Sequence, residues 1–212
     1  MKKGSFNEQV IAVGRRGAGK SEWNIARCLD YARIPCYIVA HDLGHKIPEQ
    51  LHDGRRTFVR YFGSADEARE GFRKDPRGIF SISSPSADEV MDLANELADL
   101  SLEKHGGVEG HPCIFFVDEV VSAEICDPHY IDPHFKQFMM ESRHRNVGIV
   151  VGTQSSRILH NLLFTQATHV ELFSVTDSKD AKRLVECGIP EDVVRQAAKL
   201  PAHKSISVKI GM

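Results

Sequence analysis

Gly14-Arg15-Arg16-Gly17-Ala18-Gly19-Lys20-Ser21 is the stretch of this chain that decides its fold. It matches G-x-x-x-x-G-K-[ST], the consensus of a phosphate-binding loop. The apolar run 10–13 before it is typical of a strand, and 22–29 after it repeats apolar residues at helical spacing. A glycine turn between a strand and a helix points backbone N–H groups and the positive end of the helix dipole at an anion. The sequence therefore predicts a nucleotide bound at residues 14–21.

Each residue type in this loop has a chemical role. Lys20 is expected to reach the β- and γ-phosphates, and the Ser21 hydroxyl to ligate Mg²⁺. The glycines allow a close backbone approach that a Cβ would block. The alternative is a glycine-rich turn that happens to end in Lys-Ser, which chance would produce in roughly one chain of this size in a hundred. The predicted nucleotide-binding residues of the loop are Gly14, Arg15, Arg16, Gly17, Ala18, Gly19, Lys20 and Ser21.

A pair of acids, Asp118-Glu119, follows the most hydrophobic run of the chain, 112–117. Ligands of open α/β sheets lie at the carboxyl ends of strands, so both acids are expected beside the phosphates. Asp118 would hold Mg²⁺, and Glu119 would orient and polarise a water for attack on the γ-phosphate. This arrangement suits hydrolysis better than transfer to an organic hydroxyl. The alternative is that Glu119 only caps the following segment.

Thr153-Gln154 ends another apolar strand, which is expected over 147–152. If this strand lies beside the strands that carry the phosphate-binding loop and Asp118, Gln154 faces the γ-phosphate and senses it or positions water. On its own, a polar pair after a strand is ordinary turn sequence.

Two arginines, Arg143 and Arg145, stand at the end of a helix expected over 132–144. One interpretation is structural, because cations there compensate the helix dipole and Asn146 ends the helix. The other is that one of them is an arginine finger that reaches the γ-phosphate of a neighbouring subunit. The sequence leaves both open, and Arg157 is a third candidate.

Strands that alternate with helices predict one α/β domain over residues 1–212, with a mostly parallel sheet covered by helices on both faces. The strands are expected at 10–13, 35–40, 57–62, 78–82, 112–117, 147–152, 168–173 and 205–210. The helices are expected at 22–29, 65–74, 86–104, 132–144, 177–187 and 190–200, and the segment 43–55 is expected to be irregular.

Charge and hydropathy exclude several classes of protein. A formal net charge of −2 leaves no overall basic surface, so contact with nucleic acid needs a local patch or an oligomer. No apolar run is long enough to span a membrane and the N-terminus lacks the apolar core of a signal peptide, so a cytoplasmic protein is expected. The arginines and lysine of 55–77 form either a mixed-charge solvated surface or a patch that neutralises DNA phosphates.

Two similar tetrapeptides, Asp127-Pro128-His129-Tyr130 and Asp132-Pro133-His134-Phe135, follow the acidic pair. With Cys126, the imidazoles of His129 and His134 offer possible zinc ligands. Two Asp-Pro turns, the second of which opens a helix, are the favoured interpretation, since no C-x-x-C or H-x-x-x-H spacing supports a metal.

Taken together, these motifs resemble the FtsK–HerA superfamily of RecA-like (ASCE) P-loop ATPases. The resemblance extends over roughly residues 10–173 and includes the phosphate-binding loop, the Asp-Glu strand, the Arg-His-Arg-Asn sequence at 143–146 and the strand ending in Thr-Gln. The compact size resembles the genome-packaging ATPases of tailless, membrane-containing double-stranded DNA viruses. The filamentous-phage assembly ATPases related to zonula occludens toxin are also similar, but they carry a transmembrane segment, which the sequence does not predict here.

The resemblance implies an ATP- and Mg²⁺-dependent DNA translocase that packages a viral genome. It also implies a homo-oligomeric ring, a pentamer or hexamer, with ATP at subunit interfaces, double-stranded DNA in the pore, and a capsid or membrane vertex protein as a further partner. Lys20, Ser21, Asp118, Glu119 and Gln154 would take the roles given above, and Arg143 or Arg145 would act in trans. The alternatives are a small-molecule kinase, a phage assembly or secretion ATPase, and an assembly subunit whose nucleotide is structural.

Overall fold

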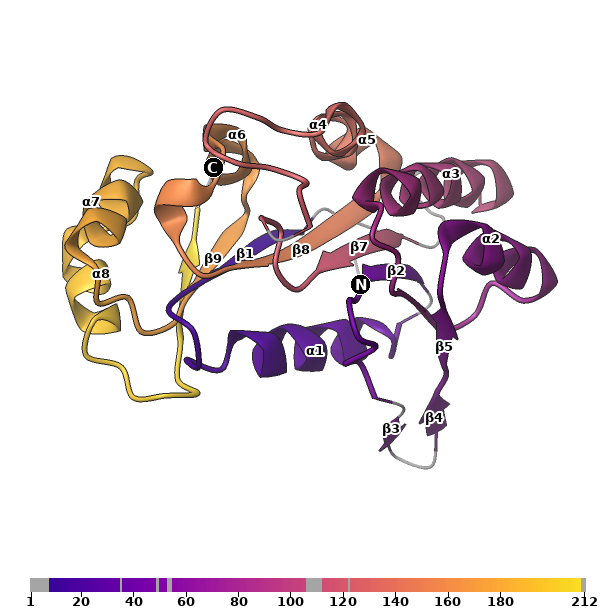
Figure 1. The fold of residues 1–212 in the computed structure, drawn as a ribbon, viewed down its shortest axis with the longest axis horizontal. Helices are drawn as coiled ribbons and strands as arrows, with labels where there is room; N and C mark the ends of the chain where they lie inside the picture. The colour runs from indigo at the N-terminus through magenta and orange to yellow at the C-terminus, as the bar shows by residue number, and fades with distance from the viewer. Residues whose placement is uncertain are drawn as a thin grey trace.

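The computed structural model describes residues 8–34, 36–48, 50–52, 55–105, 112–121 and 123–210 (Figure 1). Among these residues, eight strands form one sheet in the order β10-β9-β1-β8-β7-β2-β6-β5. Neighbouring strands are parallel except β9 and β10, which are antiparallel. The strands are β1 (Gln9–Val13), β2 (Tyr37–His41), β5 (Val59–Phe62), β6 (Ile79–Ile82), β7 (Cys113–Val117), β8 (Val147–Thr153), β9 (His169–Leu172) and β10 (Ile206–Lys209). The predicted α/β class and mostly parallel sheet are confirmed.

The connection between β2 and β5 differs from the prediction. Part of the segment expected to be irregular forms β3 (Gln50–His52), which pairs antiparallel with β4 (Arg55–Thr57) as a separate two-stranded sheet. The predicted strand 57–62 is accordingly divided between the end of β4 and β5. The hairpin escaped sequence analysis because its strands are short and polar, so they lack the alternation that marks a half-buried strand.

The helices lie close to their predicted positions, with two differences. The helix expected over 132–144 is two helices, α4 (Pro133–Met140) and α5 (Ser142–Arg145), and α6 (Asn161–Gln166) follows the 3₁₀ turn η2 (Ser156–Ile158) in a segment for which no helix was expected. The others are α1 (Lys20–Tyr31), α2 (Ala65–Lys74), α3 (Ala87–His105), α7 (Ser178–Glu186) and α8 (Glu191–Ala197). None of these described helices has both the length and the apolarity needed to cross a membrane.

The two Asp-Pro sequences form the turns that the sequence favours. Asp127 Oδ1 accepts hydrogen bonds from the N–H groups of His129 and Tyr130, both at 2.7 Å. Asp132 caps α4 by accepting the N–H of Phe135 at 2.8 Å. Such a cap satisfies a donor that the helix N-terminus leaves unpaired and stabilises the helix by about 1 kcal/mol.

Helices cover both faces of the sheet, as Figure 1 shows for α1 on one side and α3 and α4 on the other. The ring of Phe115 on β7 packs edge-on against Phe135 and Phe138 of α4. Its neighbour Phe116 points to the opposite face, in a cluster with Cys28 of α1. Every residue of β7 is buried, which explains the continuous apolar run in the sequence.

The topology brings the ends of three strands together. β8 lies between β1 and β7, and all three run parallel. Their carboxyl ends therefore share one edge of the sheet, where β1 leads into Gly14, β7 into Asp118 and β8 into Gln154. The strand that ends in Gln154 therefore lies beside the strands that carry the phosphate-binding loop and Asp118, which was the condition for placing Gln154 near them.

Gly152 of β8 shows how closely these strands approach. A Cβ at Gly152 would lie 2.1 Å from the carbonyl oxygen of Asp118 and 2.6 Å from the Nδ2 atom of Asn24. Because the nearer atom belongs to the backbone, Gly152→Ala must push the end of β7 away from β8. We expect this substitution to lower the free energy of unfolding by about 3 kcal/mol, measured by urea denaturation.

Gly63→Ala is the matched control. Its Cβ would meet nothing nearer than the Oε2 atom of Glu67 at 3.5 Å. The free energy of unfolding should then change by less than about 1 kcal/mol. Equal losses in the two variants would contradict the close approach of β8 to Asp118.

Candidate nucleotide-binding site

The phosphate-binding loop is hydrogen-bonded to the end of β8 and to the segment that follows β9. The N–H of Gly14 donates to the carbonyl of Thr153 at 3.3 Å, and the N–H of Arg15 donates to the carbonyl of Ser174 at 3.1 Å. Gly19 occupies the position before α1 with φ +98°, a left-handed conformation that favours glycine. The loop thus passes directly from a buried strand into a helix N-terminus, the geometry that binds anions.

Lys20 is buried at the start of α1, and its Nζ atom donates to the carbonyl oxygen of Arg15 at 3.1 Å. Burial lowers the pKa of Lys20, while the nearby carboxylates of Glu119 and Asp118 oppose that shift. The ammonium is therefore held within the loop, close to both acids.

Asp118 is joined to α1 by two hydrogen bonds. The Ser21 hydroxyl donates to Asp118 Oδ2 at 3.0 Å, and Asn24 Nδ2 donates to Asp118 Oδ1 at 3.4 Å. A hydroxyl and a carboxylate at this separation are hard oxygen donors, the type that Mg²⁺ selects. Ser21 and Asp118 thus fit the metal site that the sequence predicts, and Asn24 is a positioning residue that the sequence analysis missed.

Glu119 combines burial with an incompletely satisfied carboxylate. Burial raises the pKa of Glu119, opposed by the charge of Lys20 and by a hydrogen bond from the Gln154 side chain. One oxygen, Oε1, is buried and has no hydrogen-bond partner among the described residues. Glu119 as a whole lines a cavity together with Lys20 and Gln154, so its carboxylate can accept a hydrogen bond from a water there.

These residues line one cavity of about 410 Å³. The predicted residues in its walls are Arg16, Gly17, Gly19, Lys20, Ser21, Asp118, Glu119 and Gln154. The structure thus brings together the phosphate-binding loop, the acidic pair and the polar end of β8. It also adds Glu22, His41, Leu43, Lys46 and His203, none of which was predicted as a site residue.

His203 reaches the phosphate-binding loop from the segment that precedes β10. Its N–H donates to the carbonyl of Ala18 at 2.9 Å, and its ring Nδ1 lies 2.7 Å from Glu22 Oε2. A Cβ at Gly19 would lie 2.8 Å from His203 Cα. The C-terminal segment therefore forms one wall of the cavity and packs against the phosphate-binding loop motif.

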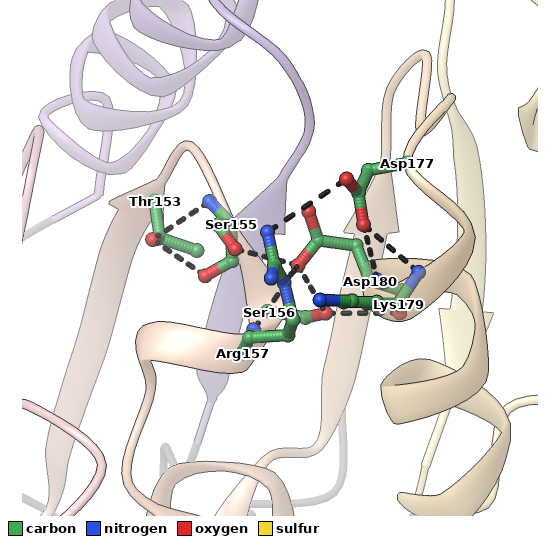
Figure 2. Close-up of polar contacts among 7 residues, drawn as sticks. All are labelled: Thr153, Ser155, Ser156, Arg157, Asp177, Lys179 and Asp180. Carbon is green, nitrogen blue, oxygen red and sulfur yellow. Dashed lines mark hydrogen bonds and ion pairs between the residues drawn. The ribbon is translucent and has the colours of Figure 1, made fainter.

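A buried carboxylate on α7 fixes the segment that follows Gln154 (Figure 2). Asp180 Oδ1 accepts hydrogen bonds from the hydroxyls of Ser155 and Ser156, at 2.5 and 3.1 Å, and from the N–H of Arg157 at 3.1 Å. Asp180 itself is only 7% exposed. The backbone on the carboxyl side of Gln154 is thus anchored to a second element, which restricts where the Gln154 amide can point.

The candidate arginine fingers occupy different environments. Arg145 is buried and donates to Asp99 at 2.7 Å and to Asn95 at 2.7 and 2.8 Å, which supports the structural interpretation for this residue. The side chain of Arg143 lies outside the described part of the chain, while its backbone belongs to α5. Arg157 is exposed at the carboxyl end of β8, where its guanidinium faces the carboxylates of Asp177 and Asp180 at 3.8 and 3.5 Å.

Three of the basic residues of 55–77 form ion pairs with acids. Arg60 lies 2.5 Å from a carboxylate oxygen of Asp75, and Arg77 lies 2.8 Å from the other. Arg69 contacts Glu96 at 2.8 Å. These ion pairs favour the mixed-charge interpretation of this surface, and the side chains of 55–57 lie outside the described part.

No family model and no curated protein sequence matches the chain, but its fold is similar to solved structures. The genome packaging NTPase B204 from Sulfolobus turreted icosahedral virus 2, in complex with AMPPCP, has a TM-score of 0.69 at 14% identity, covering 95% of this chain and 92% of that chain. The DNA-packaging ATPase B204 from Sulfolobus Turreted Icosahedral Virus has a TM-score of 0.67 at 15% identity, covering 98% and 93%. The cytoplasmic domain of the Thermomonospora curvata type VII secretion ATPase EccC has a TM-score of 0.50 at 13% identity, covering 97% and 24%. The RecA-like architecture implied by the motifs, and with it the resemblance to viral packaging ATPases, is confirmed at the level of the fold.

The raised pKa of Glu119 predicts how its replacement affects stability. In the unfolded chain this carboxyl ionises at an ordinary glutamate pKa, whereas the folded protein keeps its proton to higher pH. The fold therefore loses stability as the pH rises from the unfolded pKa to the folded one, because only the unfolded state releases the proton over that range. Glu119→Gln has no ionisable group at this position, so its stability does not fall with pH for this reason.

Urea denaturation of wild type and Glu119→Gln across a pH series measures the effect. The stability of the variant relative to wild type should increase as the pH rises above the ordinary glutamate pKa, and then level off. A difference that is constant with pH, or one that changes in favour of wild type, would contradict the burial of Glu119 beside Lys20.

Proposed function

We propose that this protein is an ATPase that works as a subunit of a DNA-translocating motor, of the kind that packages a viral genome. The observation that carries the proposal is the single cavity in which Lys20, Ser21, Asp118, Glu119 and Gln154 meet. The fold shared with viral genome-packaging NTPases supports it. We place its action in the host cytoplasm or at a virion vertex.

The chemistry follows from the charges of these residues. The phosphate-binding loop and Lys20 would hold the β- and γ-phosphates. Mg²⁺ at Ser21 and Asp118 would neutralise part of the phosphate charge. Glu119, whose carboxylate lines the cavity, would hold the attacking water and polarise it. Gln154, hydrogen-bonded to Glu119, would orient the same water or sense the γ-phosphate.

The ring assembly implied by the family resemblance remains part of this proposal. Subunits would form a pentamer or hexamer around double-stranded DNA, with an arginine of one subunit completing the site of the next. Because the Arg145 guanidinium donates hydrogen bonds to Asn95 and Asp99 of its own chain, we assign the trans-acting role to Arg143. A capsid or membrane vertex protein would anchor the ring.

Glu119→Gln tests the hydrolytic role. The amide is isosteric with the carboxylate but is a poor base, so nucleotide affinity should change little while turnover falls by about a hundredfold or more. Affinity is measured with a fluorescent ATP analogue, and turnover by phosphate release with and without double-stranded DNA. Unchanged turnover would remove Glu119 from the role of water activator. Phosphate transfer to an organic acceptor without stimulation by DNA would favour a kinase.

Arg143→Ala tests the assembly. In mixtures with wild type at constant total protein, each variant subunit should deprive the neighbouring site of its arginine and inactivate it. The ATPase activity should therefore fall more steeply than the wild-type fraction. Arg33→Ala, at an exposed arginine paired with Asp30, is the control and should leave activity unchanged. A fall in proportion to the Arg143→Ala fraction would contradict a trans-acting arginine at this position.

A further inference from the structure

Lys46 stands in the connection between β2 and β3, on a backbone fixed by a buried acid. Asp42, only 1% exposed, accepts the N–H of Lys46 on Oδ1 and the N–H of Ile47 on Oδ2, both at 3.0 Å. The Ser81 hydroxyl of β6 donates to Asp42 Oδ2 at 2.9 Å. This arrangement holds the backbone of Lys46 at the carboxyl end of β2, the strand next to β7.

The residue that follows Lys46 reinforces this position. Ile47 is completely buried, in the cluster that also contains Phe116 of β7. Its carbonyl accepts a hydrogen bond from the hydroxyl of Tyr61 at 2.8 Å. The connection is therefore anchored on both sides of the lysine backbone, and the freedom that remains is in the Lys46 side chain.

The side chain of Lys46 reaches into the nucleotide cavity. Its Nζ atom lies 3.2 Å from Asp118 Oδ2, the same oxygen that accepts the Ser21 hydroxyl. The side chain is 54% exposed, whereas Lys20 is buried and donates to its own loop. The cavity thus contains a fixed ammonium and a second one on a long, half-exposed stem.

We propose that Lys46 is a γ-phosphate-recognising residue that acts within its own subunit. It pairs with Asp118 when no triphosphate is bound and moves to a γ-phosphate oxygen when Mg²⁺-ATP binds. A divalent ion at Ser21 and Asp118 places like charge beside the Lys46 ammonium and weakens its attraction to Asp118. The terminal phosphate, expected between the loop and Glu119, supplies a new anion within reach of the lysine stem.

This role makes Lys46 a determinant of specificity for triphosphate over diphosphate. With a diphosphate the γ-oxygens are missing, so the ammonium gains no phosphate contact and adds little to the affinity. The proposal rests on the proposed ATPase function, because it assumes that the cavity binds a nucleotide with its terminal phosphate near Glu119. It differs from the trans-acting arginine because it needs no second subunit.

Affinities of Mg²⁺-ATPγS and Mg²⁺-ADP, measured by calorimetry on wild type, Lys46→Met and Lys46→Arg, test the proposal. Lys46→Met should weaken ATPγS binding by about tenfold or more, as expected for one charge-assisted hydrogen bond, and change ADP binding by less than about threefold. Lys46→Arg keeps the charge and should restore part of the preference. Lys182→Met on α7, at a lysine 80% exposed and paired with Glu186, is the matched control.

Each outcome decides between the two proposals. Equal losses for ATPγS and ADP, or no loss for either, in a wild type that binds and hydrolyses ATP would overturn the role of Lys46 and leave the ATPase proposal standing. A wild type that binds neither nucleotide would overturn both. Methionine keeps the apolar stem of Lys46. The hydrogen bonds to Asp42 come from the backbone N–H groups of residues 46 and 47, so the substitution leaves them in place. Unfolding curves verify that each variant is folded.

Discussion

The site depends on one geometric constraint, the insertion of β8 between β1 and β7. Adjacent parallel strands lie about 4.8 Å apart, so β1 and β7, which lead into the phosphate-binding loop and the acidic pair, are separated by roughly 10 Å. The end of β8 fills the floor between them with Gly152, Thr153 and Gln154. The absence of a side chain at Gly152 lets the carbonyl of Asp118 approach, and the N–H of Val120 donates to the carbonyl of Gly152 at 3.0 Å.

Groups of opposite charge, Lys20 and Glu119, are partly removed from solvent at this edge of the sheet. Burial disfavours the charged forms of both Lys20 and Glu119, and each partly offsets the shift in the other. Lys46 adds a second cation at Asp118, so the two acids face two ammonium groups in one cavity. A triphosphate with its metal would bring both charge signs into this arrangement, so we expect the effects of substituting these residues to be coupled rather than additive.

Local patterns were enough to predict the framework of the site. The phosphate-binding loop, the buried run of β7 and the Asp-Glu pair are continuous in sequence, and each carries its own physical signature. The residues that sequence analysis missed act over long separations. Lys46 and Asp118 are 72 positions apart, and His203 and Glu22 are 181 apart. Arg145 is a further example. The sequence left open whether it is structural or an arginine finger, and its hydrogen bonds to Asn95 and Asp99 on α3 favour the structural role.

A crystal structure with Mg²⁺-ATPγS tests the central claim most directly. The account predicts a γ-phosphate beside Glu119, with one ordered water about 2.6–3.2 Å from a Glu119 carboxylate oxygen and in line with the terminal phosphorus. A nucleotide whose terminal phosphate points away from Asp118 and Glu119, with no water between it and Glu119, would contradict hydrolysis at this edge of the sheet.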